Sequence, residues 1–330
     1  MTDGNPIEEQ YSYDGWLVFN ELFDTTLLAE GIGISEVVET FPSYEGGAPN
    51  DPDNGFEHTE LSQKIQSLAE LSDGFERYAE NLHAFKYVDE DWVQEWGYDE
   101  EANQQIFYRD KHDEVEIFWD SDNEVMMFRG DQQLLERKRK SLRSGLSGSL
   151  ELDPVDFDFD FFLWVLYKKY KGEELSADLR VRNLTRGKTI GDQKDNLGRQ
   201  VQVEGSENII RSLMLIAPVL AGKKIKGIQG QFVMESHTIS AEIQHGGKVH
   251  VKVSNSPLSG LSHLRRMGIA LRFLSELIRL FSDWEELPDK ERYPPASFFD
   301  ELGDIAEEEG WDLQYDPREI KDEYRRKRGA

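Results

Sequence analysis

The side chains best suited to chemistry in this chain are cations gathered in one stretch. Between Phe161 and Leu280 there are 19 Lys and Arg against 10 Asp and Glu, whereas the whole chain carries a net charge of −27. Clustered Lys and Arg on one domain are the electrostatic footprint of a surface that binds phosphate groups. The positions assigned to that surface are Arg180, Arg182, Arg186, Lys188, Arg199, Lys223, Lys224, Lys226, Lys248, Lys252, Arg265, Arg266 and Arg272.

Outside this stretch the chain is strongly acidic. Asp and Glu number 65 against 38 Lys and Arg, and residues 1 to 136 hold 34 acids against 6 bases. Dispersed carboxylates at this density are typical of proteins from salt-accumulating archaea, so we expect a halophilic source. In roughly 1 M salt the Debye length is about 3 Å. Binding to phosphates would then depend on direct hydrogen bonds, for which Arg is better suited than Lys.

Two other interpretations of the positive charge stay open. The basic residues can pair with the acidic first half of the chain, or dock on an acidic partner protein. They can also be an ordinary mixed surface that is basic only by contrast. Binding to phosphate groups is the working hypothesis among these interpretations. We therefore expect a non-enzymatic nucleic-acid-binding or regulatory protein that binds DNA or RNA. A protein–protein interaction module is the alternative, and a metal-dependent nuclease is the third hypothesis.

No catalytic constellation is indicated. The chain has no cysteine, which excludes disulfides, thiolate metal sites and a cysteine nucleophile. Its histidines lack the His-x-x-x-His spacing of a helical metal site. Gly187-Lys188-Thr189 ends like a phosphate loop, but Arg182 stands where that loop needs its first glycine. The Glu-x-Lys triplets that begin at Glu136 and Glu319 match some nucleases, but both are expected outside strands.

An acidic run precedes the cationic stretch. Its carboxylates are those of Asp153, Asp156, Asp158 and Asp160. Oxygen ligands at this spacing could be presented to Mg²⁺ or Ca²⁺. In so acidic a chain a solvated segment ahead of a helix is the simpler interpretation, and we adopt it. We therefore predict no metal, no cofactor and no catalytic residue.

Hydrophobic periodicity predicts the elements of the first half. Apolar residues at 16, 19, 23 and 27 predict a helix, and a second short helix follows Ser35. Further helices are predicted from Leu61 to Leu71 and over 131–143. Period-two patterns predict a meander of strands 106–109, 115–119 and 125–128, with turns at 110–113 and 120–123. The aromatic, acidic passage 87–98 fits neither period.

Composition also predicts the division into domains. The Gly- and Ser-rich segment 144–150 is the expected linker. The predicted parts are an acidic α+β domain at 1–143, a basic α+β domain at 151–285 and an acidic tail or helical extension at 286–330. Each domain is expected to hold a short antiparallel meander packed by helices.

The second half allows its strand register to be predicted. Helix 161–170 with a basic end precedes strands around 179–182 and 201–203, and a helix from Ser206 to Leu220 follows. In 238–244 and 248–254 apolar residues alternate with polar ones, and directly opposed residues share a face. A three-residue loop His245-Gly246-Gly247 pairs Ile243 with Val249, whereas a two-residue loop would mix the faces. Ile228 and Phe232 of the preceding strand are expected to face the same core.

A long amphipathic helix is predicted over 258–284, lying across the second sheet. At about 1.5 Å per residue it is roughly 40 Å long, and Arg265, Arg272 and Arg279 line one flank at seven-residue spacing. The chain starts without the basic and apolar regions of a signal peptide, and its longest apolar run, 209–220, is too short for a membrane span. We expect a cytoplasmic protein with no membrane partner.

Overall fold

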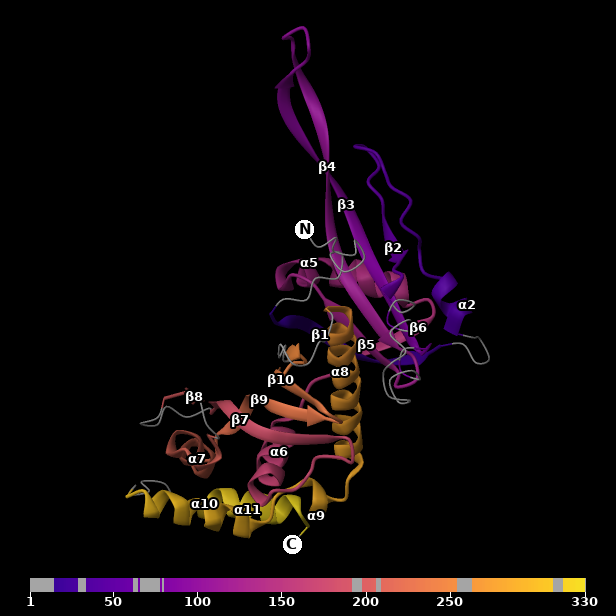
Figure 1. The fold of residues 1–330 in the computed structure, drawn as a ribbon. Coiled ribbons are helices and arrows are strands. Elements are labelled where there is room, and N and C mark those ends of the chain that lie inside the picture. The colour runs from indigo at the N-terminus through magenta and orange to yellow at the C-terminus, as the bar shows by residue number, and fades with distance from the viewer. Residues whose placement is uncertain are drawn as a thin grey trace, which may run out of the picture. The chain divides into compact units, whose positions relative to one another are not determined.

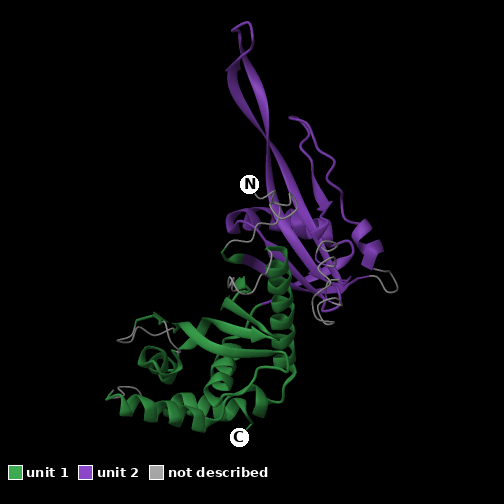
Figure 2. Cartoon of the chain, viewed as in Figure 1, with its two compact units in different colours: residues 1–17, 156–330 green, residues 18–155 purple. Residues whose placement is uncertain are grey.

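The computed structural model of the chain describes residues 15–28, 34–61, 65, 78, 80–191, 198–205, 209–253, 263–310 and 317–329. The fold is mixed α and β with antiparallel strand pairs, as expected (Figure 1). It divides into two compact units (Figure 2). Unit 2 is Val18–Val155, and unit 1 combines Asp156–Ala330 with Met1–Leu17.

The division between the units falls after Val155, rather than in the Gly- and Ser-rich segment at 144–150. Residues 144–146 form the last turn of helix α5 (Gln132–Leu146), and Leu150 begins strand β6 (Leu150–Pro154). Leu146 and Leu150 are both buried in the core of unit 2. Local composition resembles a linker here because a helix end and a tight turn use the same small residues as a linker.

Unit 2 is an antiparallel sheet covered by helices. Its strands are ordered β2-β3-β4-β5-β1, and β6 also pairs with β1. Besides α5 and β6, its elements are β1 (Leu17–Leu27), α2 (Ile34–Glu39), β2 (Asn54–His58), β3 (Leu82–Tyr98), β4 (Gln104–Asp120) and β5 (Val125–Arg129). Phe85, Trp119 and Phe128 of the sheet share a buried core with Leu135 and Leu142 of α5. The Asp131 side chain caps α5 by accepting from the Leu134 N–H at 3.0 Å.

The helix predicted around Trp16 to Leu27 is wrong, because this segment is strand β1. The register of β1 against β5 shifts between Phe19 and Glu21. A bulge adds one residue to the strand, so buried positions no longer alternate strictly. Phe19, Leu22 and Phe23 are buried, and this spacing imitates one side of a helix.

The turn predicted at 110–113 is also wrong. Those residues lie inside β4, which pairs continuously with β3 from Leu82 opposite Asp120 to Tyr98 opposite Gln104. The polar residues tolerate an extended conformation because this part of the ribbon packs on no core. The strands predicted at 115–119 and 125–128 and the turn that joins them are confirmed, as are helices α2 and α5. Most of the helix predicted over Leu61–Leu71 lies outside the described residues.

Unit 1 is built on a second run of antiparallel strands, ordered β11-β10-β9-β7-β8. Its elements are α6 (Phe159–Lys171), β7 (Leu179–Ile190), β8 (Gln200–Glu204), the 3₁₀ turn η1 (Ile209–Arg211), α7 (Leu213–Leu220), β9 (Lys224–Met234), β10 (His237–Gln244), β11 (Val249–Val253), α8 (His263–Glu286), α9 (Asp289–Arg292), α10 (Ala296–Glu308) and α11 (Arg318–Lys327). Helix α6 follows an Asp158 cap and ends at Gly172 in the left-handed conformation, with Lys168, Lys169 and Lys171 in its last turn.

The predicted register of the β10–β11 hairpin is confirmed. Ile243 lies opposite Val249 and Ala241 opposite Val251, and Gly246 and Gly247 of the loop both have positive φ. Alternate residues of β9, β10 and β11 therefore form one buried face, on which Phe232 and Val251 are fully buried. Helix α8 packs on this inner face, with the rings of Phe232 and Phe273 5.5 Å apart.

The remaining helices complete unit 1. Phe161 of α6 stacks edge-on against Phe281 of α8 at 5.2 Å. Helix α7 packs closely on the inner face at β7, where a Cβ added to Gly187 would lie 2.8 Å from the Leu215 side chain. The expected acidic extension folds as α9, α10 and α11, and buries Phe298 and Tyr324 within this unit. Residues 254–262, the predicted start of the long helix, and Ser206 lie outside the described residues.

Candidate functional site

The outer face of the unit 1 sheet carries many of the predicted cations. Register places residues of neighbouring strands in transverse rows across this face. One row runs Glu204, Arg186, Gln229, Glu242, His250 from β8 to β11. The next row toward the β10–β11 loop places Lys188 beside Gly227. Because Gly227 has no side chain, the lysine side chain has room to extend along the sheet.

Glu242 is the electrostatic centre of the first row. Its carboxylate accepts from Lys188 Nζ at 2.7 Å and lies 3.9 Å from Arg186 Nη1 and 3.5 Å from His250 Nδ1. Burial tends to raise the pKa of Glu242, but the hydrogen bond and charge of Lys188 bring it below the usual range. Burial also lowers the pKa of His250, in spite of the opposing effect of Glu242. These cations are therefore held by a carboxylate of their own sheet.

Other predicted cations are tied to carboxylates or backbone within unit 1. Lys224 Nζ lies 2.6 Å from Glu323 of α11, and Arg272 Nη1 lies 2.7 Å from Glu235. Lys223 is buried and donates to the Gly198 carbonyl at 2.6 Å. Arg266 is buried beside His263, and Arg265 is half-buried on the same helix. Several of the predicted cations are thus held by carboxylates distant in sequence, such as Glu323 for Lys224 and Glu242 for Lys188.

The outer face also has two rows that contain no carboxylate. One row runs Asn183, Gln231, Ser240, Lys252 and the next runs Arg180, Val233, Thr238. The register of β7 shifts between Val181 and Asn183, and this leaves Arg182 exposed at the edge of these rows. We call these eight positions the acid-free rows.

Within the part of the chain that the structure describes, five of the predicted cations have no carboxylate within ion-pair distance. They are Arg180, Arg182, Arg199, Lys226 and Lys252. Arg180 and Arg182 are exposed and Lys252 is half-exposed. Three of the five belong to the acid-free rows, which also carry the amide and hydroxyl side chains of Asn183, Gln231, Ser240 and Thr238.

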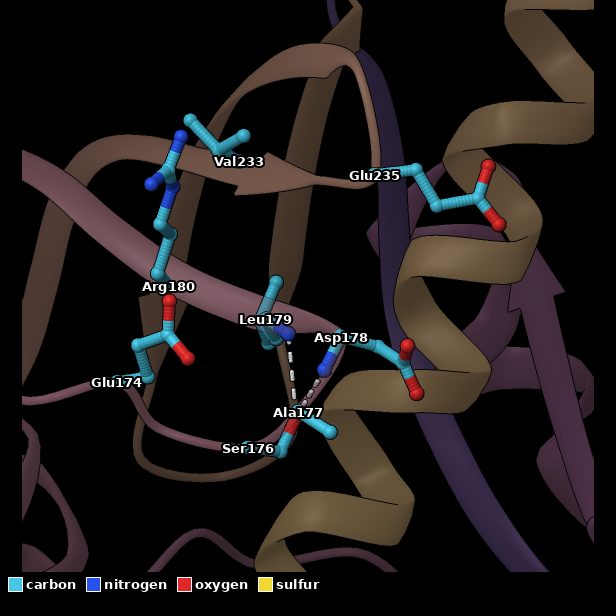
Figure 3. A pocket seen from close by; sticks show the side chains of 8 residues that line it. All are labelled: Glu174, Ser176, Ala177, Asp178, Leu179, Arg180, Val233 and Glu235. Carbon is cyan, nitrogen blue, oxygen red and sulfur yellow. Dashed lines mark hydrogen bonds between the residues drawn. The ribbon is translucent and has the colours of Figure 1, made fainter.

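A small pocket of 290 Å³ lies at the end of these rows (Figure 3). It is lined by Glu174, Ser176, Ala177, Asp178, Leu179, Arg180, Val233 and Glu235. Ser176 Oγ accepts from the backbone N–H groups of Asp178 and Leu179 at 3.4 and 3.1 Å, which makes it a turn residue. Figure 3 shows Asp178 and Glu235 directed toward helix α8, while Arg180 and Val233 point together along the outer face.

The arginine flank of α8 explains that arrangement. Arg272 binds Glu235, and Arg279 Nη2 lies 4.0 Å from Asp178 and 2.5 Å from Glu276. The seven-residue spacing of Arg272 and Arg279 therefore places both side chains where they bind carboxylates of the sheet. Asp178 lies directly before β7 and Glu235 directly after β9, so these ion pairs hold α8 against the two strands. The pocket holds charged groups in structural roles and offers no nucleophile paired with a base among its lining residues.

The acidic run ahead of α6 serves the fold. Asp156 Oδ1 accepts from the Gly246 N–H at 2.8 Å and lies 3.0 Å from His245 Nδ1. Asp158 caps α6 by accepting from the Asp160 N–H at 2.7 Å. Asp160 is buried and accepts from the Tyr324 hydroxyl and from Lys327 Nζ. Within the described residues no three His, Asp or Glu side chains converge as metal ligands.

Unit 2 contains a feature that periodicity did not predict. The outer parts of β3 and β4, residues 89–113, form a two-stranded ribbon that extends beyond the rest of the unit, and we call it the arm (Figure 2). Large apolar side chains are exposed along it, with Trp96 69% and Tyr98 71% accessible. Trp92, Trp96 and Tyr98 alternate at period two before a polar turn, and this signal in the sequence could have identified the hairpin.

No protein-family model matches the chain, and no curated protein sequence matches it. Among the described helices, none is long and apolar enough to cross a membrane.

Proposed function

We propose that the outer face of the unit 1 sheet binds the backbone of a nucleic acid, and that the protein is a non-enzymatic binding protein. The observation that carries this proposal is the acid-free rows. Asp and Glu make up 65 of 330 residues, yet two adjacent rows of one sheet face hold cations, amides, hydroxyls and Val233, and no carboxylate. Two rows without a carboxylate in so acidic a chain suit an anionic ligand.

The side chains of the rows favour direct contact over long-range attraction. Arg180 and Arg182 present planar guanidinium groups, which can donate two parallel hydrogen bonds to one phosphate. Asn183, Gln231 and Ser240 can bond sugar hydroxyls and phosphate oxygens between them. Such contacts persist when concentrated salt screens charge beyond a few ångströms. This agrees with the halophilic, cytoplasmic setting that we propose from the composition.

The same face lacks the means to read bases. Of its described residues only His250 carries a ring, whereas sheets that bind single strands by stacking display Phe, Tyr or Trp. We therefore propose recognition of phosphate and sugar with little dependence on sequence. Arg186 and Lys188, already held by Glu204 and Glu242, are proposed as the border of the surface.

The test is fluorescence anisotropy with labelled duplex DNA, single-stranded DNA and single-stranded RNA, titrated from about 0.5 to about 3 M KCl. The variant R180A/R182A/K252A removes the three unpaired cations of the rows. K168A/K171A/R325A is the matched control, because it removes three cations of unit 1 that are paired with Glu173, Glu301 and Asp322.

We expect the first variant to weaken binding by about tenfold or more, and to reduce the slope of log K against log salt by about 2 to 3, since each phosphate contact contributes about 0.7 to 0.9. The control should change affinity by less than about twofold. If none of the three nucleic acids binds, or if both variants weaken binding equally, the acid-free rows are not the binding surface.

A further inference from the structure

The arm of unit 2 presents one apolar face. In an antiparallel ladder directly opposed residues share a face, and the register pairs Trp96 with Ile106, Gln94 with Tyr108 and Tyr98 with Gln104. Trp92 continues the same face toward the body of the unit. Ile106 and Tyr108 are 42% and 45% accessible. This face, which we call the aromatic face, holds no charged residue from Gln94 to the tip.

The opposite face of the arm has a different composition. Glu95 lies opposite Phe107, and Arg109 binds Glu95 at 2.8 Å. The Phe107 ring lies over Gly97, where a Cβ would come within 2.9 Å of it. This face is therefore partly covered by contacts within the arm, with Phe107 still 41% accessible, and a side chain at Gly97 would displace the ring. On the aromatic face Gln94 Nε2 donates to the Tyr108 hydroxyl at 3.5 Å, while Trp96 and Tyr98 remain 69% and 71% accessible.

The arm is held in shape before any partner arrives. At the tip, Asp99 Oδ1 accepts from the N–H groups of Glu101 and Asn103 at 3.0 and 2.8 Å, and the bond from Asn103 is the main reason that the pKa of Asp99 is lowered. At the base, Glu90 Oε2 accepts from the N–H groups of Gly47 and Asp53 at 2.6 and 3.1 Å. From residue 89 to 98 the ribbon extends about 30 Å at about 3.3 Å per residue.

Exposed Trp and Tyr are among the side chains that contribute most to protein interfaces. In a soluble protein a contiguous exposed apolar patch marks an interaction site. We propose that the aromatic face of the arm inserts into an apolar groove of a partner protein whose rim carries Lys and Arg. This inference is independent of the nucleic-acid proposal, which concerns unit 1.

The charge of the arm selects that partner. Between residues 89 and 113 nine acids stand against Arg109 and Lys111. The acids at the tip are Asp99, Glu100 and Glu101, beside the most exposed aromatic residues. Phosphate backbones and anionic lipid headgroups would be repelled by this element, whereas a groove with a cationic rim complements it at contact distance.

The experiment uses the full chain as bait for a phage library of random peptides, panned in concentrated KCl. We expect the selected peptides to combine Leu or Phe with Lys or Arg, and the synthetic peptides to bind the full chain. W96S/Y98S should weaken that binding by about tenfold or more, since removing a central aromatic anchor commonly costs this much. L28S/M214S is the control, because it removes two other exposed apolar side chains, and should retain affinity within about twofold.

Charge reversal at the tip provides a second measurement. E100K/E101K leaves every aromatic residue in place, and should weaken the same peptides by about fivefold or more if the partner rim is cationic. Selection of acidic peptides, or equal binding by W96S/Y98S and the wild-type chain, would overturn the proposal. Two further results would also overturn the proposal. The first is a concentration-dependent dimer that only W96S/Y98S abolishes, because the occupant would then be a second copy of the chain. The second is flotation of the chain with phosphatidylcholine or phosphatidylglycerol vesicles.

Discussion

Replacing Asp160 with Asn tests whether the C-terminal helix is fastened to unit 1 by one buried carboxylate. Asp160 is 8% exposed in the first turn of α6. One of its oxygens accepts from the Tyr324 hydroxyl and the other lies 2.6 Å from Lys327 Nζ, and both partners belong to α11. Lys327 and Lys224 in turn bind Glu323 at 2.8 and 2.6 Å.

The size of the effect follows from what each substitution leaves behind. Asp160→Asn leaves the half-buried Lys327 with Glu323 as its remaining carboxylate, and removing one partner of a buried pair costs about 3 kcal/mol. Tyr324→Phe keeps the ring contact with Phe299 at 4.9 Å and loses one hydrogen bond to a charged acceptor, about 2 kcal/mol. Because both changes act on one carboxylate, the double variant should lose about 3 to 4 kcal/mol, less than the sum.

The assay is hydrogen exchange of peptides spanning 318–327, followed by mass spectrometry. A local readout is needed because two compact units need not unfold in one transition. We expect exchange in α11 to accelerate by about a hundredfold for Asp160→Asn, the factor equivalent to about 3 kcal/mol. Asp322→Asn on the same helix is the control, since its pair with Arg325 is exposed and worth little. Equal exchange in Asp160→Asn and Asp322→Asn would refute this account of how α11 is held.

Three further predictions concern packing and titration. Gly230→Ala should destabilise unit 1 by about 2 to 3 kcal/mol in urea unfolding, because its Cβ would lie 2.4 Å from the Asn183 carbonyl, whereas Gly303→Ala meets nothing within 4 Å and should be neutral or stabilising. An NMR titration should place the pKa of His250 below 6.5, since burial lowers it; the unfolded chain then binds more protons, so stability falls as pH drops below 6.5, and His250→Gln should reduce that fall. Burial, aided by the charge of Asp89, raises the pKa of Tyr87 to about 12. Its contribution to stability is therefore complete below pH 10 and lost as pH rises toward 12, and absorbance titration of Tyr87→Phe should lack a phenolate that forms near pH 12.

Parts of the fold could be predicted from the sequence where a local pattern of apolar and polar residues was compatible with only one arrangement of the backbone. Val249, Val251 and Val253 alternate with polar residues, and only a three-residue loop aligned them with Ile239, Ala241 and Ile243 on one face. Helix α6 was recognisable because its aromatic residues and its basic last turn agree. Strand β1 was not, since the bulge after Phe19 removed the alternation that identifies a strand.

The candidate site, like the fold, could be predicted from the sequence only in part. The excess of cations between Phe161 and Leu280 is a property of the sequence, and Arg180, Arg182 and Lys252 could be assigned to a surface from it. Which cations remain unpaired was not predictable. Lys224 meets Glu323 across 99 positions of the chain, and Lys188 meets Glu242 across 54.

The sequence by itself determined the charge, the acidity, the inward faces of β9, β10 and β11 and the period of α5 and α6, because these depend on neighbouring residues. The tertiary structure decided which carboxylate meets which cation. Strand β9 lies between β10 and β7, although β7 precedes it by a long connection, and this order brings Arg180 and Asn183 beside Val233 and Gln231. Ion pairs form only at contact distance, so the strand order, rather than the charge count, left two rows of the face without an acid.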